Sequence, residues 1–310
     1  MEPPFVVVGE SLVDVVVPLR GEPSQAVGGS PMNVAVGLAR LGVPTVLITQ
    51  VGDDEHGRWI SEHVRASGAR LADVSVLPGR TTSTSTARLD ADNAASYEFD
   101  LTWDLAHHTL PDHVLGLHVG SIAAALLPGR LTVVDMVRQA QADDTFVSYD
   151  PNVRPAFVTD RDQAWRDVAE LAASSRLVKV SDEDLEALRP GCSVEESTAE
   201  LLTGAAELVI VTHGASGSSA YSEASAVHVR APSVEVVDTV GAGDSFMAAT
   251  LAILLEWNLP QNGPGAIAAL DDDHVEELLG GAMAAAAVTC SRRGADPPTR
   301  SDLPATWPAV

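Results

Sequence analysis

Short apolar runs alternate with segments of helical spacing along most of the chain. The apolar runs are rich in Val, Ile and Leu and are bounded by Gly, Pro or Asp, which is typical of buried parallel strands. We expect strands at 5–10, 45–52, 113–121, 145–151, 176–181 and 208–214, and helices at 32–42, 56–68, 162–175, 193–206, 245–257 and 274–290. The alternation predicts an α/β fold, a doubly wound, mostly parallel sheet covered by helices on both faces.

One stretch departs from this pattern. Residues 80–103 alternate polar and apolar positions, are rich in Thr and Ser, and contain the turn sequence DADN. This predicts a β-hairpin with one solvated face, with which the run LVDVVVPL at 12–19 would pair. A small sheet that projects from the α/β body would serve either as a lid or only as an edge decoration.

Size and charge narrow the class of protein. The 310 residues suit one large α/β domain, and neither a linker nor a repeat divides 1–310. The net charge of −24 repels phosphate backbones and anionic lipid, so we expect no nucleic acid and no membrane as partner. Glu10 and Asp14 interrupt the first apolar run, which reads as a strand rather than a signal peptide, and the two cysteines have no disulfide or metal spacing. We therefore expect a cytoplasmic protein.

The stretch DTVGAGDSF at 238–246 places small residues between two carboxylates. We expect EVVDTV (235–240) to be a strand and the apolar run from 245 to be a helix, with GAG as the turn between them. The first N–H groups of a helix lack internal partners and favour an anion. Asp244 beside such an anion site suits a general base that takes a proton from a hydroxyl attacking a phosphoryl group. The alternative is an ordinary helix N-cap.

Three other elements carry candidate polar groups. In VGGSPMNVAVG (27–37), the glycine pair Gly28-Gly29 allows a ligand to approach the backbone closely. Asn33, in the first turn of the next helix, would either hydrogen-bond to a polyol or cap the helix. Asp14 is either a surface charge or an acceptor for sugar hydroxyls. The turn in VTHGASGS (211–218) would cradle nucleotide phosphates or close a hairpin. No P-loop or HExxH pattern is present.

Together these elements resemble the PfkB (ribokinase-like) family of carbohydrate kinases, over essentially the whole chain and in the family's order. The stretches that carry the resemblance are GGSPMNVAVGLARLG (28–42), VGDDEHG (51–57), YDPNVRP (149–155), VTHGASG (211–217) and DTVGAGDSF (238–246). The resemblance implies a ribokinase-like fold and ATP-dependent phosphorylation of a sugar hydroxyl. It also implies that the segments at about 12–19 and 80–103 form a β-lid, which in this family often serves as a homodimer interface.

The resemblance also assigns roles to individual residues. Asp244 would be the base, and the N–H groups of Gly241, Ala242 and Gly243 would form the anion hole. Asp14, Gly28, Gly29 and Asn33 would hold the sugar, while Thr212, Gly214 and Gly217 would line the nucleotide site.

Two ion sites are implied with departures from the family's pattern. The family's Asn-x-x-Glu motif for Mg²⁺ is replaced by Ser181 and Asp184 in KVSDEDL. For a monovalent cation such as K⁺, Asp238 and Val240 match one side of the family's site, and the carbonyls near Arg292 and Gly294 would form the other.

The middle of the chain bears on the choice of sugar. The stretches 87–100, 119–129 and 150–154 look most like bacterial fructokinases, which favours fructose as the acceptor and fructose 6-phosphate as the product. Arg154 would contact the phosphoryl group or an acidic substrate, as in a 2-keto-3-deoxygluconate kinase, and Arg88 would touch the sugar or only solvent. Ribokinases and nucleoside kinases remain alternatives, as does a non-catalytic sugar- or nucleotide-binding regulator.

Overall fold

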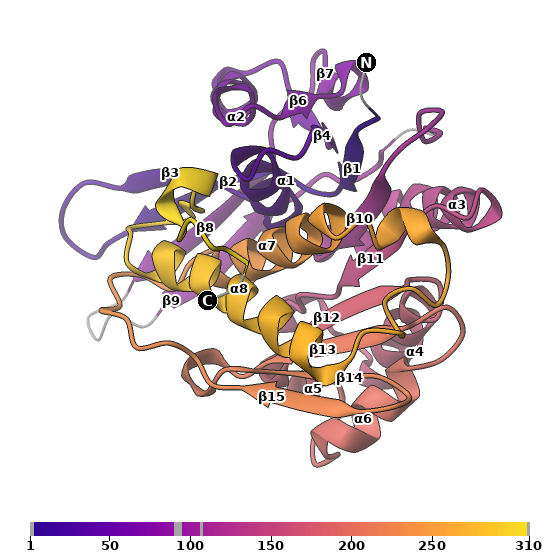
Figure 1. The fold of residues 1–310 in the computed structure, drawn as a ribbon. Helices are drawn as coiled ribbons and strands as arrows, with labels where there is room; N and C mark the ends of the chain where they lie inside the picture. The colour runs from indigo at the N-terminus through magenta and orange to yellow at the C-terminus, as the bar shows by residue number, and fades with distance from the viewer. Residues whose placement is uncertain (1–2, 90–94, 106–107, 309–310) are drawn as a thin grey trace.

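The computed structural model describes residues 3–89, 95–105 and 108–308. Within these residues the main sheet has the strand order β15-β14-β13-β12-β11-β10-β1-β4-β6 (Figure 1). The pairs from β6 to β13 are parallel, and β14 and β15 add an antiparallel edge. The strand bounds are β1 (Phe5–Val8), β4 (Thr45–Ile48), β6 (Arg70–Leu71), β10 (Gly116–Gly120), β11 (Val147–Asp150), β12 (Leu177–Ser181), β13 (Leu208–Thr212), β14 (Ser218–Tyr221) and β15 (Ala226–Val229).

Helices cover both faces of this sheet, as predicted. One hydrophobic cluster joins one face to α1 (Ser30–Arg40), α2 (Glu55–Ala66), α7 (Ala242–Glu256) and α8 (Asp272–Cys290). A second joins the other face to α3 (Gly129–Ala142), α4 (Arg161–Ala172), α5 (Asp182–Leu188) and α6 (Val194–Leu201). Within β1, Phe5 and Val7 belong to the first cluster, and Val6 and Val8 to the second. Burial on both sides explains why the strands read as unbroken apolar runs.

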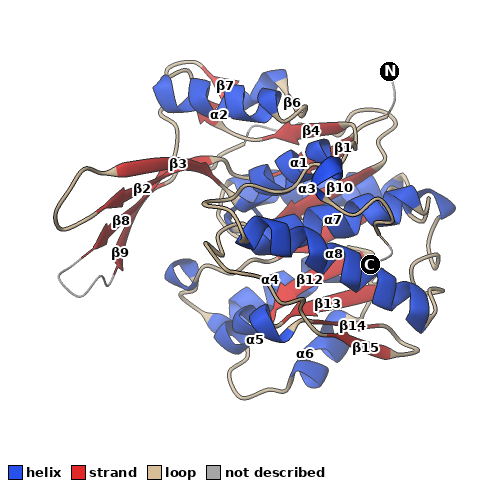
Figure 2. Cartoon of the chain, turned by 60° about the vertical axis from the view of Figure 1, so that its left-hand side comes forward, coloured by secondary structure: helices blue, strands red, loops and turns tan. Residues whose placement is uncertain are grey.

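A second sheet projects from the body (Figure 2). Its order is β3 (Ser24–Gly28), β2 (Leu12–Val17), β8 (Thr84–Leu89) and β9 (Ala95–Asp100). The predicted hairpin at 80–103 is present as β8 and β9, and β8 pairs with the predicted partner β2. The DADN turn lies outside the described residues. The short pair β5 (Val51–Gly52) and β7 (Val76–Leu77) divides the predicted strand 45–52 into two pieces.

The predicted strand EVVDTV at 235–240 is wrong. No strand covers these residues, and the side chains of Val236 and Val237 are more than half exposed. The backbone N–H groups of Val237 and Asp238 both donate to the carbonyl of Cys290, the last residue of α8. The segment is therefore fastened to a helix end instead of a sheet edge. Its valines lie at the surface, which the sequence alone could not reveal.

Candidate active site

The candidate site lies where the strand order of the main sheet reverses. β1 pairs with β4 on one side and with β10 on the other, and open α/β sheets bind ligands at the carboxyl ends of strands at such a point. Glu10 follows the end of β1, and Asp150 ends β11. Glu10 is buried and accepts a hydrogen bond from the backbone N–H of Ala123. Burial raises the pKa of Glu10 to about 7.

The turn Gly241-Ala242-Gly243 begins α7 three residues earlier than predicted. Gly241 is the N-cap in the left-handed region, with φ of 77°, and a Cβ at this position would lie 2.6 Å from that of Ala295. The helix therefore includes Asp244 in its first turn, where the orphan N–H groups favour an anion. The side chain of Asp244 does not cap the helix, so the capping alternative is not what the structure contains.

Two side chains at the start of α1 hold the carboxylate of Asp244. The hydroxyl of Ser30 donates to Oδ1 at 2.6 Å, and Nδ2 of Asn33 donates to Oδ2 at 2.7 Å. All three residues are buried, with Asp244 only 7% exposed. Sequence reasoning assigned Asn33 to the sugar and missed Ser30, whose only signal was its place before Pro31 at the start of a helix. The two bonds fix the orientation of the carboxylate.

The glycine pair shapes the floor beside this cluster. Gly29 is the N-cap of α1 with φ of 114°, and a Cβ there would lie 2.5 Å from the carbonyl oxygen of Glu10. A Cβ on Gly28 would lie 2.2 Å from Oδ2 of Asp14. Both positions thus need glycine, one for its backbone conformation and one to leave space for a carboxylate.

Asp14 connects the projecting sheet to this region. Burial raises the pKa of Asp14, while the hydroxyl of Ser85 and the charge of Arg154 lower it in part. Arg154 is exposed and donates to the side-chain oxygen of Asn152. Arg88 lies elsewhere: it pairs across the strands with Val17 at the end of β2, and its guanidinium contacts Glu98 at 3.6 Å with both side chains exposed.

The predicted nucleotide loop follows β13. Thr212 ends the strand, and Gly214 and Gly217 both have positive φ, 52° and 111°. A Cβ on Gly217 would lie 2.1 Å from the carbonyl oxygen of Val229. The loop therefore presses against the end of β15 and the segment that follows it.

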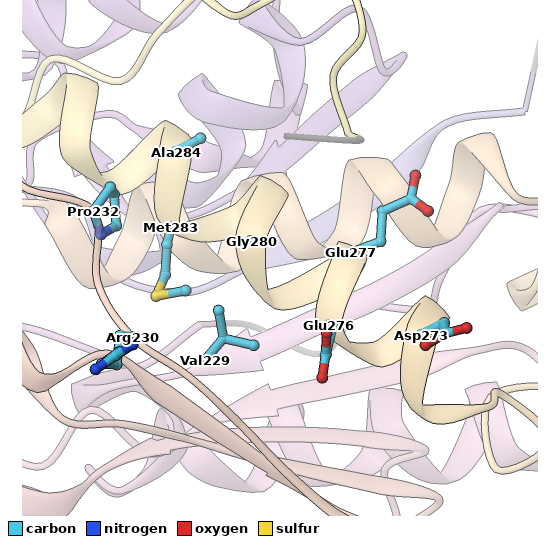
Figure 3. A pocket seen from close by; sticks show the side chains of 9 residues that line it. All are labelled: Val229, Arg230, Pro232, Asp273, Glu276, Glu277, Gly280, Met283 and Ala284. Carbon is cyan, nitrogen blue, oxygen red and sulfur yellow. The ribbon is translucent and has the colours of Figure 1, made fainter.

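A cavity of about 540 Å³ opens beside that contact (Figure 3). Val229, Arg230 and Pro232 line one side, and α8 lines the other with the small or flexible side chains of Gly280, Met283 and Ala284. Asp273, Glu276 and Glu277 of α8 complete its acidic end. Sequence reasoning did not identify these residues, because no motif marks a cavity between a helix and a strand end.

At the predicted Mg²⁺ site, the two candidate side chains already have protein partners. Ser181 and Asp184 form a capping box at the start of α5, and Oδ1 of Asp184 also accepts from the N–H of Val153. Each oxygen keeps a further lone pair, which suits a metal-bound water more than a direct bond, and Mg²⁺ characteristically keeps several waters. In the described part of the chain, no group of three or more His, Cys, Asp or Glu side chains is arranged to hold a metal.

The monovalent-cation loop is built around Asp238. Its Oδ1 accepts from the N–H of Val240 at 3.1 Å, and its Oδ2 accepts from the N–H of Gly294 at 2.8 Å. These bonds join the two predicted sides of the site, and they hold the pKa of Asp238 below its usual value. Arg292 contacts Asp302 at 3.1 Å, so its side chain is engaged in an ion pair.

A buried ion pair that sequence reasoning missed lies beneath the turn of α7. Nζ of Lys179 donates to Oδ2 of Asp150 at 2.9 Å, with side chains 5% and 1% exposed. The same Nζ lies 3.2 Å from where a Cβ on Gly243 would be. Burial raises the pKa of Asp150 to about 6, and the ammonium limits that rise. The signal was a lone lysine inside a strand of buried apolar residues, which requires a partner.

Comparison with known proteins decides the family. The model described as pfkB family carbohydrate kinase matches residues 5–302. The chain belongs to this family.

Relatives of this carbohydrate kinase are named fructokinases. One from Rhizobium leguminosarum bv. trifolii is 34% identical over 264 residues, covering 81% of this chain and 79% of the relative. One from Klebsiella pneumoniae is 33% identical over 291 residues, covering 91% and 92%. The expected family and its α/β fold are thus confirmed.

Solved structures agree on the fold. A fructokinase from Xylella fastidiosa matches this carbohydrate kinase with a TM-score of 0.81 at 24% identity, covering 97% of both chains. A double mutant of a Vibrio cholerae O395 fructokinase, in a fructose-, ADP- and potassium-bound form, matches with a TM-score of 0.77 at 25% identity, covering 94% of both.

In this carbohydrate kinase the fold gathers most of the predicted site residues at one edge of the sheet. Asn33 contacts Asp244, Gly28 adjoins Asp14, and Asp238 joins Val240 to Gly294. Arg88 stands apart on the projecting sheet, paired with Glu98. Across the described residues, no helix combines the length and apolar character that crossing a bilayer requires.

Proposed function

We propose that this carbohydrate kinase transfers the γ-phosphoryl group of ATP to a hydroxyl of fructose, giving fructose 6-phosphate. The observation that carries the chemistry is the carboxylate of Asp244, held by Ser30 and Asn33 in the first turn of α7. The fructokinase names of the relatives support fructose as the acceptor.

Asp244 acts as the general base. It accepts the proton of the attacking hydroxyl as the hydroxyl oxygen bonds to the γ-phosphorus and ADP leaves with the electrons of the broken P–O bond. The N–H groups of the turn from Gly241 to Gly243 face the developing negative charge and stabilise it without reorganisation. The bonds from α1 keep the carboxylate in line with this turn.

The sugar binds between the projecting sheet and α1. Asp14 accepts hydrogen bonds from sugar hydroxyls, and Gly28 and Gly29 let the ring approach the backbone. Asn33 contributes from α1 and Arg154 from the loop after β11. Arg88 takes no part, because its exposed side chain contacts Glu98 and solvent. Closure of this sheet as a lid excludes water, which would otherwise compete as phosphoryl acceptor.

The nucleotide occupies the loop from Thr212 to Gly217 and the adjacent cavity. The loop's backbone faces the phosphates, and the apolar walls from Val229 and Met283 suit the flat face of adenine. Carboxylates at the far end of the cavity repel phosphate, which favours the orientation with phosphates toward α7.

Two ions complete the proposed site. Asp184 and Ser181 would hold Mg²⁺ through its waters; the ion, when bound, neutralises phosphate charge. The carbonyls near Arg292 and Gly294, with Asp238 and Val240, would hold K⁺. The Vibrio cholerae fructokinase described above is a potassium-bound form, which supports this second assignment.

A second acceptor is favoured by one observation. The exposed guanidinium of Arg154 lies close enough to Asp14 to lower its pKa, so it is available for a substrate carboxylate at the sugar site. An acidic sugar such as 2-keto-3-deoxygluconate would use this cation.

We further propose a homodimer through the projecting sheet. Leu19, in the connection between β2 and β3, is 62% exposed, as expected of a residue that a partner would cover.

The test is ADP release with Mg²⁺ and K⁺ across fructose, 2-keto-3-deoxygluconate, ribose and nucleosides. Release with fructose, and at least tenfold less with the others, is the expected result. Release with another sugar keeps the mechanism and replaces the acceptor. ATP binding without release for any sugar contradicts the kinase proposal and favours a binding regulator.

A further inference from the structure

The chain's only lysine lies beneath the proposed anion hole. Lys179 occupies the middle of β12, with its side chain on the face of the sheet that α1, α7 and α8 cover. Its Nζ is 2.9 Å from Oδ2 of Asp150 and 3.2 Å from the Cβ position of Gly243. The ammonium therefore abuts the last residue of the turn, where a Cβ would make a tight contact with it.

The ammonium has hydrogen-bonding capacity to spare. It carries three N–H donors, and among the described residues its side chain makes one hydrogen bond, to Asp150. A structural ion pair that is taken out of water needs its remaining donors satisfied to break even. In the part of the chain that the structure describes, the Lys179–Asp150 pair leaves the other two donors without a partner.

Negative charge gathers around this ammonium. Asp150, Asp184 and Asp244 all raise the pKa of Lys179 through their charges, although burial alone would lower it. The imidazole of His118 is buried, and its pKa is lowered to about 3 by burial and by the charge of Lys179, so it is neutral. Three carboxylates against one cation would repel a triphosphate, unless the cation lies nearest to where the phosphates bind.

We propose that Lys179 is a positioning residue for the triphosphate: its ammonium, anchored by Asp150, acts through the Gly243 backbone to attract the phosphates into the anion hole. This inference rests on the proposed function, since it needs a nucleotide at that turn. The two members of the pair therefore have opposite effects on ATP affinity. The charge of Lys179 attracts the phosphates, and the charge of Asp150 repels them.

The test compares ATP affinity, measured by calorimetry at fixed Mg²⁺ and salt, in Lys179→Met and Asp150→Asn. Lys179→Met weakens ATP binding by about tenfold, and Asp150→Asn tightens it by severalfold, as expected for one charge at this range in a partly screened site. The affinity for AMP, which has no γ-phosphoryl group, changes by less than half as much as the affinity for ATP on a logarithmic scale. If both variants weaken ATP binding, or neither changes it, the pair is only structural and the inference is overturned.

A double variant keeps the test decisive if a single variant unfolds. Lys179→Met with Asp150→Asn removes both buried charges and should melt near the wild-type temperature, because neither charge is left unpaired. Its ATP affinity should exceed that of Lys179→Met and fall below that of Asp150→Asn, because the two effects oppose each other. An affinity outside these limits, or equal to that of a single variant that folds, overturns the inference. A wild-type protein that binds ATP but phosphorylates no sugar contradicts the proposed function, while the signs of the two single variants still decide the role of Lys179.

Discussion

Two buried ion pairs involve β12 or the residue just before it, and they are built differently. Arg176, just before the strand, contacts Glu207 with side chains 7% and 9% exposed. Lys179, inside the strand, contacts Asp150 with side chains 5% and 1% exposed. The first pair lies at the amino end of the parallel strands, and the second at the carboxyl end, where α/β sheets bind ligands.

The amino-end pair is saturated with partners. Besides Glu207, the guanidinium of Arg176 donates to the carbonyls of Pro260 and Gly263. Glu207 in turn accepts from the N–H groups of Ile267 and Ala268. Burial alone would raise the pKa of Glu207, but these bonds hold it below its usual value. The pair fastens the loop after α7 to the sheet.

The carboxyl-end pair shows the opposite balance. The pKa of Asp150 is raised to about 6, because burial and neighbouring carboxylates outweigh the ammonium. Within the described part of the chain, the ammonium makes a single hydrogen bond and lies beside a glycine turn. If Lys179 has the proposed role, the saturated pair stabilises the architecture and the unsaturated pair is available for a ligand's charge.

The largest expected effect tests the chemistry at the carboxyl end. Asp244→Asn should lower kcat by roughly 10²- to 10⁴-fold, the usual contribution of a general base, because an amide cannot accept the proton. Sugar affinity should persist. Steady-state kinetics and sugar binding check this, and a variant that retains most of its rate would show that another group is the base.

The matched variant lies at the amino end. Glu207→Gln should lower the free energy of unfolding by about 3–5 kcal/mol, because it leaves a buried guanidinium unpaired. The kcat of the folded fraction should stay within about twofold of wild type, because the pair is remote from the turn. Urea unfolding and kinetics without urea measure both quantities. A loss of kcat comparable to that of Asp244→Asn would erase the contrast between the two ends.

Glu10 gives a smaller effect that depends on pH. Its folded-state pKa, raised to about 7 from 4.5, means that the native state binds this proton more tightly than the unfolded state. The stabilisation is complete below about pH 4.5 and disappears as pH rises through 7, by at most about 3 kcal/mol. Glu10→Gln should therefore gain stability relative to wild type between pH 5 and pH 8. Urea unfolding of variant and wild type at pH 5 and pH 8 measures this. The same difference in unfolding free energy between the two proteins at both pH values would contradict the prediction.

The smallest expected effect concerns the sugar. Asp14→Ala should raise the KM for fructose about tenfold, since it removes hydrogen bonds to a charged acceptor, and leave the KM for ATP unchanged. Kinetics with each substrate varied in turn separate the two constants. An unaltered KM for fructose removes Asp14 from the sugar pocket.

Sequence reasoning recovered what short patterns encode. The periodicity of the apolar runs predicts the layered sheet, and GGSPMN and GAGD predict, to within three residues, where two helices begin and which polar groups stand there. The glycines could be identified because a positive φ or a close contact leaves no other residue. These features depend on residues that are close together in the sequence, so the sequence alone is enough to predict them.

The remainder depends on contacts between distant segments. That Ser30 bonds to Asp244, or that Lys179 lies under Gly243, follows from how α1 and β12 pack against α7. The run 235–240 is rich in valine, as a strand would be, but the N–H groups of Val237 and Asp238 donate to the end of α8. A pattern predicts what a segment would pair with, and only the packed structure decides which partner is available.

Lys179 also provides a single chemical probe for transient opening of the carboxyl edge of the sheet. It is the only lysine in 310 residues, and its side chain is 5% exposed. Reagents that acylate lysine side chains can reach it only when the carboxyl edge of the sheet opens transiently. The rate at which a single acyl group appears at this position, with and without nucleotide, therefore measures how often the catalytic edge opens under native conditions.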